Sequence, residues 1–306
     1  MSISRAADIL RAGGLVVFPT ETVYGLGADA TNPLAVARIY EAKGRPQFNP
    51  LIAHVPGLAE AEQHAHVHEK ARALAEAFWP GPFTLVARRR AESSVAELAC
   101  AGLATIALRA PSHPMARELL AAFGGPIVAP SANRSGHVSA TTAQHAADDL
   151  GARVDLVLDG GACPIGLEST IVAVDDEGVA TLLRPGAIAR ADIERLVGPL
   201  AASAKAEPVT APGMMESHYA PRASMRLDAD APRAGEAYLA FGAPAPAGGA
   251  TLSASGDLVE AAANLYAALR GLDSTGAEFI AVAPIPPLGL GEAIRDRLMR
   301  AAAPRK

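Results

Sequence analysis

Short apolar runs alternate with helical patterns along residues 1–200 of this chain, and no other feature constrains its fold as strongly. Runs of three to five residues have the length of buried strands, whereas helices need longer amphipathic segments. The predicted strands cover residues 15–18, 51–55, 83–87, 105–108, 126–129, 156–158, 170–174 and 180–184. The pattern predicts an α/β fold with a mixed sheet flanked by helices.

A change of composition after Leu200 predicts a domain boundary. Residues 207–222 carry three prolines and Gly213 without a usable hydrophobic period, which is typical of a linker. Beyond it, apolar runs at 237–241 and 279–282 and helical patterns around 258–269 and 292–301 predict a second, smaller α/β unit. We expect a first domain over 1–200, a linker over 201–224 and a small α/β domain over 225–306.

The composition excludes several classes of function. The 306 residues carry a net charge of −5 and only 4% aromatic side chains, which disfavours a broad nucleic-acid-binding face but allows a local site for a small anion. No segment is apolar over the roughly 18 to 20 residues that a membrane helix needs, and no export signal opens the chain. Cys100 and Cys163 lie far apart, without the spacing of a metal or redox site. We therefore expect both to be small buried residues of a protein in a reducing compartment, which favours the cytoplasm.

Two cations flank a glycine in Lys43-Gly44-Arg45-Pro46, between a predicted helix and the predicted strand 51–55. Asn32-Pro33 is a plausible start for that helix, with Asn as N-cap and Pro at the first helical position. A cationic pair at the mouth of a strand suggests an anion site. A solvated surface turn is the alternative, because Lys and Arg are usually exposed.

Three further segments lie at predicted strand ends, where α/β sheets commonly bind ligands. Pro19 to Gly27 follows the first strand, Ser131-Ala132-Asn133 follows the strand 126–129, and Gly166 to Thr170 enters the strand 170–174, while Arg184 ends the next one. Thr and Gly also form ordinary turns, so each segment alone is weak evidence. Their shared position at strand ends indicates one site.

Together these motifs resemble the threonylcarbamoyl-AMP synthase family. The resemblance rests on Pro-Thr-Glu-Thr-Val-Tyr-Gly-Leu from Pro19, Lys-Gly-Arg-Pro from Lys43, Ser-Ala-Asn from Ser131, Ser169-Thr170, Pro212-Gly213-Met214, and His218-Tyr219-Ala220-Pro221. It covers nearly the whole chain. It implies a YrdC-like catalytic domain with a twisted mixed sheet flanked by helices, a connecting linker, and the smaller Rossmann-like α/β C-terminal domain of the longer members.

Members of that family condense L-threonine, bicarbonate and ATP into threonylcarbamoyl-adenylate and pyrophosphate. A separate transferase complex then uses the product to modify tRNA, so the resemblance implies no strong tRNA binding by this chain. An acidic net charge fits that division of labour.

The resemblance assigns residues to both substrates. Lys43 and Arg45 match the catalytic cations, which suit a triphosphate as a point charge and a planar bidentate donor. Further positions that match the ATP contacts are Asn49, Thr105, Asn133, Thr141, Arg184 and Tyr219, and those that match the threonine contacts are Thr22, His54, Arg109, Ser131 and Ser169. By itself, a histidine in an apolar strand such as His54 is more often a core residue, and a strand-end arginine is more often solvated.

Magnesium is expected with the triphosphate, held mainly by phosphates and water. Glu21 and Glu168 are the nearest candidate protein ligands, and both have structural alternatives. His64, His66 and His68 lack acidic or cysteine partners, so we expect no metal site there.

In the longer family members the linker folds over the catalytic pocket as a lid. Here Met215, Glu216 and Ser217 stand where many relatives carry basic residues, which puts cationic help from that stretch in doubt. Two alternatives to the synthase remain: a non-catalytic RNA-binding module, which the acidity and scarce aromatics disfavour, and a related carbamoyl-handling enzyme of the same fold. Members of that last group attach the domain to others that this chain lacks.

Overall fold

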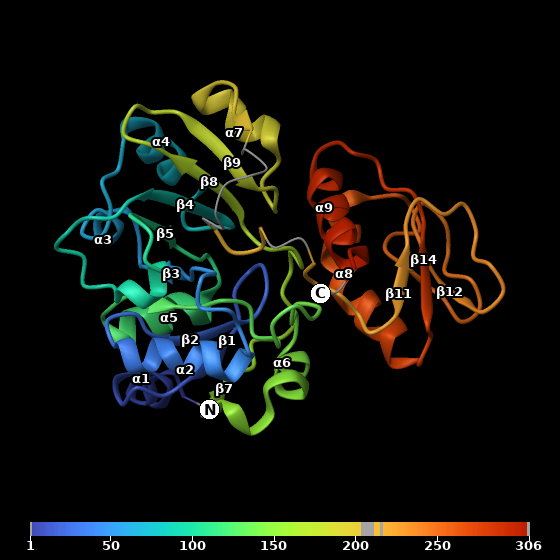
Figure 1. Ribbon diagram of the computed structural model, residues 1–306, viewed down its shortest axis with the longest axis horizontal. Helices are drawn as coiled ribbons and strands as arrows, with labels where there is room; N and C mark the ends of the chain where they lie inside the picture. The colour runs from blue at the N-terminus through green and yellow to red at the C-terminus, as the bar shows by residue number, and fades with distance from the viewer. Residues whose placement is uncertain (1, 203–210, 215–216, 305–306) are drawn as a thin grey trace.

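A computed structural model describes residues 2–202, 211–214 and 217–304 of the chain (Figure 1). Its described part contains a ten-stranded sheet and a separate four-stranded sheet, each packed against helices. The predicted α/β class is confirmed. Within these residues, no helix has the length and apolar character required to cross a bilayer.

The large sheet is mixed, with strand order β10-β9-β8-β4-β5-β3-β6-β2-β1-β7. Its strands are β1 Val16–Phe18, β2 Gly25–Asp29, β3 Ile52–His54, β4 Phe83–Arg88, β5 Thr105–Arg109, β6 Ile127–Val128, β7 Leu156–Val157, β8 Thr170–Val174, β9 Ala180–Arg184 and β10 Ala201–Ala202. β3 and β5 pair in parallel, so His54 lies directly beside Arg109 at their carboxyl ends. This pairing brings two predicted site residues together.

Strand β2 begins at Gly25, within the segment Pro19 to Gly27 that the sequence analysis placed after the first strand, and continues to Asp29. Its pairing with β1 places Gly25 opposite Phe18 and Gly27 opposite Val16. A methyl group on Gly27 would lie 2.8 Å from the Phe18 ring, so the strand needs glycine for close packing. Because it lacks the β-branched residues that mark strands, the sequence pattern missed it.

Helices cover the two faces of the large sheet unequally. They are α1 Ile3–Arg11, α2 Pro33–Lys43, α3 Leu58–Ala61, α4 Glu69–Phe78, α5 Pro114–Phe123, α6 Ala143–Leu150 and α7 Arg190–Val197, with short 3₁₀ turns at Glu97–Cys100 and Gly151–Arg153. Helices α2, α3, α4, α6 and α7 share one hydrophobic core with one face of the sheet. Helices α1 and α5 cover only the β1, β6 and β7 part of the opposite face.

Another part of that second face is covered by described residues of the linker. Ile52, Val86, Ala107 and Ile171 of β3, β4, β5 and β8 form a small apolar cluster there together with Ala211, and Met214 packs against it. The linker thus lies over the sheet beside the strand ends that carry the predicted site.

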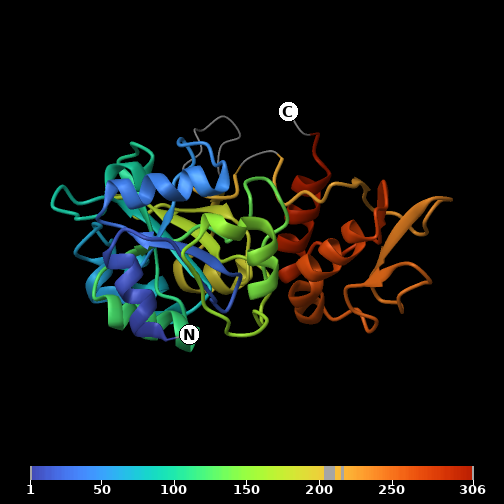
Figure 2. The ribbon, with the colours of Figure 1, turned by 90° about the horizontal axis from the view of Figure 1, so that it is seen from below.

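The small sheet is fully parallel, in the order β11-β14-β12-β13. Its elements are β11 Ser224–Arg226, β12 Glu236–Ala240, β13 Ala250–Thr251, β14 Phe279–Val282, α8 Leu258–Ser274 and α9 Leu290–Ala302. Both helices lie between this sheet and the large domain (Figures 1 and 2).

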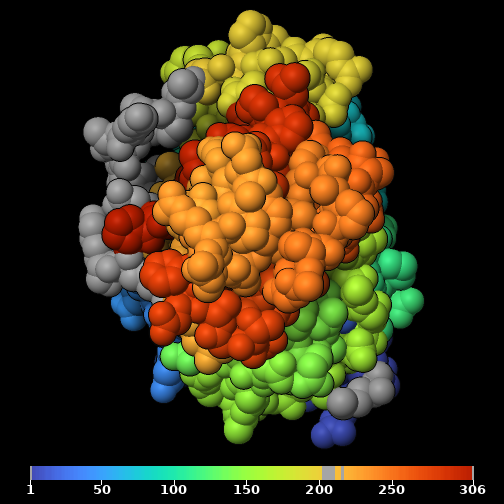
Figure 3. All heavy atoms as spheres, turned by 90° about the vertical axis from the view of Figure 1, so that its right-hand side faces the viewer, coloured from blue at the N-terminus to red at the C-terminus, as the bar shows by residue number. Residues whose placement is uncertain are grey.

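The interface between the domains is part of the hydrophobic core of the small domain. Val23, Val138, Leu167 and Tyr219 from the first part of the chain and the linker belong to the same buried cluster as α8 and α9. Figure 3 shows the small domain in front of the green and yellow segments of the large one. The predicted boundaries at 200 and 224 stay predictions, although β10 continues the large sheet to Ala202 and β11 begins at Ser224.

Gly186 provides a test of how closely β9 and β8 pack near the site. A methyl group on its Cα would lie 2.5 Å from the backbone of residues 168–170. We therefore expect Gly186→Ala to lower the free energy of unfolding by about 1–3 kcal/mol through overpacking. Gly271→Ala is the control, because Gly271 lies in α8 with nothing within 4 Å, and this exchange should be stabilising by about 0.5–1 kcal/mol.

Denaturant unfolding of both variants measures these changes. Equal stability of Gly186→Ala and the wild type would show that the backbone of residues 168–170 can move away without cost.

Candidate active site

A cavity opens at the carboxyl ends of β3, β5 and β9, between the large sheet and the linker. Its polar lining residues come from seven separate segments, and its cover is formed by linker residues. The lining residues are Val23, Arg45, Ile52, His54, Arg109, Ala129, Pro130, Ser131, Glu168, Ser169, Arg184, Pro212, Gly213, His218 and Tyr219.

Seven of the predicted site residues line this cavity. They are Arg45, His54, Arg109, Ser131, Ser169, Arg184 and Tyr219. The other six predicted residues lie outside its described lining: Thr22, Lys43, Asn49, Thr105, Asn133 and Thr141.

Helix α2 positions the Lys43–Arg45 motif. Asn32 caps its first turn by accepting hydrogen bonds from the backbone N–H groups of Leu34 and Ala35, and Gly44 ends it with a left-handed φ of 61°. The chain reverses there and directs Arg45 into the protein, where only 7% of the residue is exposed. The alternative of a solvated surface turn is wrong.

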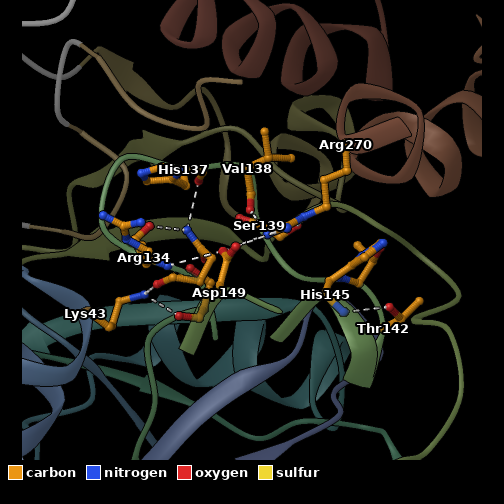
Figure 4. A network of polar contacts seen from close by, with 12 residues as sticks. Lys43, Arg134, His137, Val138, Ser139, Thr142, His145, Asp149 and Arg270 are labelled. Atoms are coloured by element: carbon orange, nitrogen blue, oxygen red, sulfur yellow. Dashed lines mark hydrogen bonds and ion pairs between the residues drawn. The ribbon is translucent and has the colours of Figure 1, made fainter. Parts of the chain in front are cut away.

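Arg45 and Lys43 are both buried, and among the described residues both donate only to backbone carbonyls. Arg45 donates through Nε to Asn49 O at 3.2 Å and through Nη2 to Pro50 O at 2.9 Å. The Lys43 ammonium donates to the carbonyls of Ser131 and Asn133 (Figure 4). Burial, with help from the neighbouring Arg45 charge, lowers the pKa of Lys43 well below its ordinary value, and burial lowers the pKa of Arg45 to about 10.

A β-bulge directs Arg184 toward the cavity. Ile171 pairs with Arg184 whereas Val172 pairs with Leu182, so β9 carries one extra residue at Leu183. Without the bulge, strand alternation would place Arg184 on the same face as Leu182, which belongs to the helix-covered core. With it, Arg184 faces the cavity beside Ile171 and donates to Ser169 O, Ser169 Oγ and Pro212 O.

Arg109 is held by an internal carboxylate. Its Nη2 lies 2.5 Å from Glu21 Oε1, and its Nε donates to Gly81 O at 3.4 Å. Burial opposes the charge of Glu21, but the Arg109 charge and hydrogen bond outweigh it and lower the pKa of Glu21. The Glu21 carboxylate therefore stays ionised and fixes the guanidinium at the cavity wall.

Two histidines line the cavity as neutral imidazoles. Burial lowers the pKa of His54 to about 3, with a further contribution from Arg109, and burial with Arg45 lowers the pKa of His218 to about 3. Within the described structure, Nδ1 of each ring is buried without a hydrogen-bond partner. Both rings can thus still form one hydrogen bond to a ligand.

Hydroxyl groups cluster beside the arginines. Ser169 Oγ lies 2.7 Å from Thr84 Oγ1 and accepts from Arg184. Thr22 is fully buried, and its Oγ1 lies 2.8 Å from Thr20 Oγ1 behind the cavity wall. Ser169 is placed to contact a ligand directly, whereas Thr22 belongs to a buried turn next to Val23.

The remaining predicted residues support the wall or lie further along the sheet. Asn133 is buried, and its side chain donates to the carbonyls of Arg134 and His137. Thr141 lies next to His145 of α6, and Asn49 is buried beside Arg45. Thr105 lies at the far end of β5 from Arg109, on the same face by strand alternation.

Glu168 contributes the carboxylate in the described cavity lining, and it forms an ion pair with the small domain. Arg297 Nε donates to it at 2.8 Å, and both residues are buried. Burial opposes its charge, but Arg297 and Arg184 outweigh that effect and lower the pKa of Glu168 to about 2.

The described lining of the cavity therefore carries more positive than negative charge, with Arg45, Arg109 and Arg184 against Glu168. Arg45 and Arg184 form no ion pair with a carboxylate of the described residues, and their hydrogen bonds go to neutral oxygen atoms. A buried cation without a counterion is costly unless a ligand supplies the negative charge. The arrangement is suited to binding a polyanion such as a triphosphate.

Neither the histidine cluster nor the two glutamates is arranged for a metal ion. His64 Nδ1 lies 3.2 Å from Ser93 Oγ, and His68 caps α4. Among the described residues no group of three or more His, Cys, Asp or Glu side chains can hold a metal. Glu21 and Glu168 each pair with an arginine.

The linker covers the cavity where it is described. Pro212 and Gly213 lie against Arg184, and Tyr219 is buried with a left-handed φ of 63°. A bulky residue adopts that conformation only where its surroundings hold it. Of the stretch that departs from the family pattern, Met215 and Glu216 fall outside the described residues, and Ser217 lies near the carbonyl of Ala303.

Sequence reasoning did not assign His218, although it quoted the His218-Tyr219 motif. It also named Glu168 only as a possible metal ligand. The signal for His218 was its place next to Tyr219, while no sequence signal relates Glu168 to Arg297, which follows it by 129 residues.

Comparisons with known proteins agree with this geometry. Residues 8–186 match the family Sua5/YciO/YrdC, described as "Telomere recombination", and residues 188–303 match the family described as "Threonylcarbamoyl-AMP synthase, C-terminal domain". The chain is 40% identical to threonylcarbamoyl-AMP synthase of Bacillus subtilis over 99% of this chain and 93% of the relative, and 40% identical to that of Pyrococcus abyssi over 97% and 93%.

A solved structure is similar over nearly the full length. P. abyssi Sua5, crystallised in complex with L-threonine, superimposes with a TM-score of 0.91 at 37% identity, covering 98% of this chain and 94% of that one. The expected YrdC-like fold with a second, smaller α/β domain is confirmed.

The low pKa of Glu168 predicts how acid affects stability. A carboxylate whose folded pKa is about 2 contributes stability above its ordinary value of 4.5, and the contribution is lost as pH falls from there toward 2. Glu168→Gln removes this titration, so its free energy of unfolding should fall less steeply between pH 4.5 and 2 than that of the wild type.

Denaturant unfolding at several pH values measures this dependence, with Glu76→Gln on the exposed side of α4 as the control. Parallel curves for the wild type and Glu168→Gln would contradict the assigned ion pair.

Proposed function

Because the chain belongs to the threonylcarbamoyl-AMP synthase family in its two-domain Sua5 form, we propose that it condenses L-threonine, bicarbonate and ATP into threonylcarbamoyl-adenylate and releases pyrophosphate. The membership also confirms the resemblance found in the sequence. One observation supports the proposal above others: Arg45, Arg109 and Arg184 face one cavity, and two of them have no carboxylate partner in the described structure.

The first step in this proposal joins threonine to bicarbonate. The amine nitrogen attacks the bicarbonate carbon and a C–N bond forms. The C–OH bond of bicarbonate then breaks, and its hydroxide leaves as water with a proton from the nitrogen, which gives a carbamate. Arg109 is suited to the threonine carboxylate, because Glu21 occupies only one of its two terminal amino groups. His54 has a free Nδ1 beside Arg109 that can hydrogen-bond the amine and orient it.

The second step transfers the adenylyl group. A carbamate oxygen attacks the α-phosphorus of ATP, the new P–O bond forms, and the bond to pyrophosphate breaks. The protein contributes mainly positioning and positive charge to such a reaction. Arg45 and Arg184 are placed for the phosphates, and Lys43 supports the same wall through the Ser131 and Asn133 carbonyls.

The linker has a place in this reaction as a cover. Pro212, Gly213, His218 and Tyr219 close the side of the cavity away from the sheet. A cover excludes water, which would otherwise hydrolyse the carbamate and the adenylate. We propose that the linker has to open for ATP to enter.

Magnesium is proposed to accompany ATP without a dedicated protein site. Glu21 and Glu168 do not fit as ligands, because each carboxylate is engaged by an arginine at 2.5 Å and 2.8 Å respectively. The ion would be bound by phosphate oxygens and water, and the roles given to the residues above do not depend on it.

We further propose that the product passes to a separate tRNA-modifying transferase in the cytoplasm. The two buried, unpaired cysteines, Cys100 and Cys163, fit a reducing compartment. The net charge of −5 fits an enzyme that does not itself bind tRNA strongly.

The proposed reaction predicts that pyrophosphate release from ATP requires both threonine and bicarbonate. A coupled pyrophosphate assay with each substrate left out in turn measures this, and a mass spectrum of products from labelled bicarbonate identifies the adenylate. Release that continues unchanged without threonine would exclude the proposal.

Loss of the cationic motif should slow turnover strongly. We expect Arg45→Ala and Lys43→Ala to lower kcat by about 10²-fold or more, because transition-state charge on the phosphate oxygens loses a partner or its support. Arg117→Ala, on the exposed side of α5, is the control and should leave kcat unchanged. Unaltered kinetics in both motif variants would refute these roles.

A further inference from the structure

The small domain neutralises a negative charge in the wall of the cavity. Glu168 is the one acidic residue among the described residues that line it. Its carboxylate accepts hydrogen bonds from Arg297 Nε at 2.8 Å, from Tyr266 OH at 2.7 and 2.9 Å, and from Ser139 Oγ at 2.7 Å. Arg297 comes from α9 and Tyr266 from α8, so three of these four hydrogen bonds come from the small domain.

Arg297 contacts the cavity wall at two further points. Its guanidinium lies over the ring of Tyr219, 5.1 Å from the ring centroid, and its Nη2 donates to Pro185 O at 3.0 Å, one residue after Arg184. Its Nη1 binds Asp296 at 2.5 Å. The side chain is fully buried and each of its nitrogen atoms has a partner, so its position is fixed.

The charge of Glu168 matters because the cavity faces an anion. In a buried site an unpaired carboxylate would repel phosphate groups strongly, since the low dielectric weakens screening. It would also compete for Arg184, whose charge helps to hold the Glu168 carboxylate ionised. Pairing with Arg297 removes both problems and leaves Arg184 available to a ligand.

This inference rests on the proposed function. We propose that Arg297 is a positioning residue for ATP binding: it offsets the charge of Glu168 and holds Tyr219 in the wall, so that the cavity presents a net positive charge to the phosphates. The C-terminal domain is thereby part of the nucleotide site, although Arg297 itself is separated from the cavity by Glu168 and Tyr219.

Contacts other than those of Arg297 also hold the two domains together. Arg270 of α8 pairs with Asp149 of α6 at 2.9 Å and also donates to the carbonyl of Val138 (Figure 4). Arg190 of α7 pairs with Glu292 of α9 at 2.7 Å, and the shared hydrophobic core spans the interface. The domains should therefore stay attached when Arg297 is replaced.

The test compares ATP binding by calorimetry in the full chain. At pH 8, Arg297→Met should raise the Kd for ATP by about 10-fold or more, because one partner of a buried charge pair is lost. The double variant Glu168→Gln with Arg297→Met removes both charges and should recover most of that loss. Glu168→Gln alone should tighten ATP binding, because Arg297 then adds positive charge near the cavity.

The pH dependence separates charge from structure. Burial opposes the charge of Glu168, and Arg297 is the largest of the groups that offset this effect, ahead of Arg184 and Ser139. The pKa of Glu168 should therefore rise in Arg297→Met, and the penalty relative to wild type should shrink as pH falls from 8 to 6 and the carboxylate begins to take up a proton. The other groups that face Glu168 are Arg184, Tyr219, Tyr266 and His218. Burial keeps His218 neutral and raises the pKa of both tyrosines, so these three groups do not titrate between pH 6 and 8 in the wild type.

Arg190→Met is the matched control, because it breaks a domain-to-domain ion pair whose residues are not among those that line the cavity. It should leave the Kd for ATP unchanged. If Arg297→Met does not fold, the Kd of Glu168→Gln for ATP still decides the question. Tighter binding than in the wild type supports the inference, and weaker binding overturns it.

Two further outcomes would overturn the inference. A pH-independent loss in Arg297→Met that the double variant does not recover would show that Arg297 acts only by packing. If the wild type binds no ATP, the proposed function fails and this inference fails with it; if the wild type binds ATP and Arg297→Met binds equally well, only this inference fails.

Discussion

Buried positive charge around one cavity, from the end of helix α2 and from the ends of strands β5 and β9, is the constraint on which the rest of this structure depends. Arg45, Arg109 and Arg184 lose their hydration where they face the cavity, and such a loss is tolerable only if other groups replace the water. Backbone carbonyls, one internal carboxylate on Arg109, and the side chain of Ser169 supply part of that replacement. Arg45 and Arg184 form no ion pair with a carboxylate of the described residues, which supports the proposal that the site binds an anion.

The cover over this cavity comes from segments that are distant in sequence from the sheet. Among the described residues no helix belongs to the apolar cluster on one face of β3, β4, β5 and β8, and Ala211 and Met214 of the linker pack there. The small domain then fixes the other end of the linker, since Tyr219 stacks on Tyr266 of α8 with ring centroids 5.8 Å apart. The large sheet, the linker and the small domain thus meet beside this cavity.

Much of the fold and several site residues could be predicted from the sequence. Short apolar runs located eight strands of the large sheet, and the Asn32 cap and Gly44 located helix α2 with its cations. Strand β2 was missed because its glycines give no strand pattern, and the pairing of Glu168 with Arg297 was missed because they lie 129 residues apart. The roles assigned to individual residues by family resemblance stay predictions.

The sequence by itself determined the α/β class, the family and the segments that carry polar residues at strand ends, because hydrophobic period, capping and motif order are local properties of the chain. Only the tertiary structure decided which of these side chains share a cavity. The bulge at Leu183 directs Arg184 toward the cavity, and no local pattern reveals a bulge because it depends on pairing with β8. Likewise, the charge state of Glu168 depends on burial and on a partner from another domain, which only the folded chain brings together.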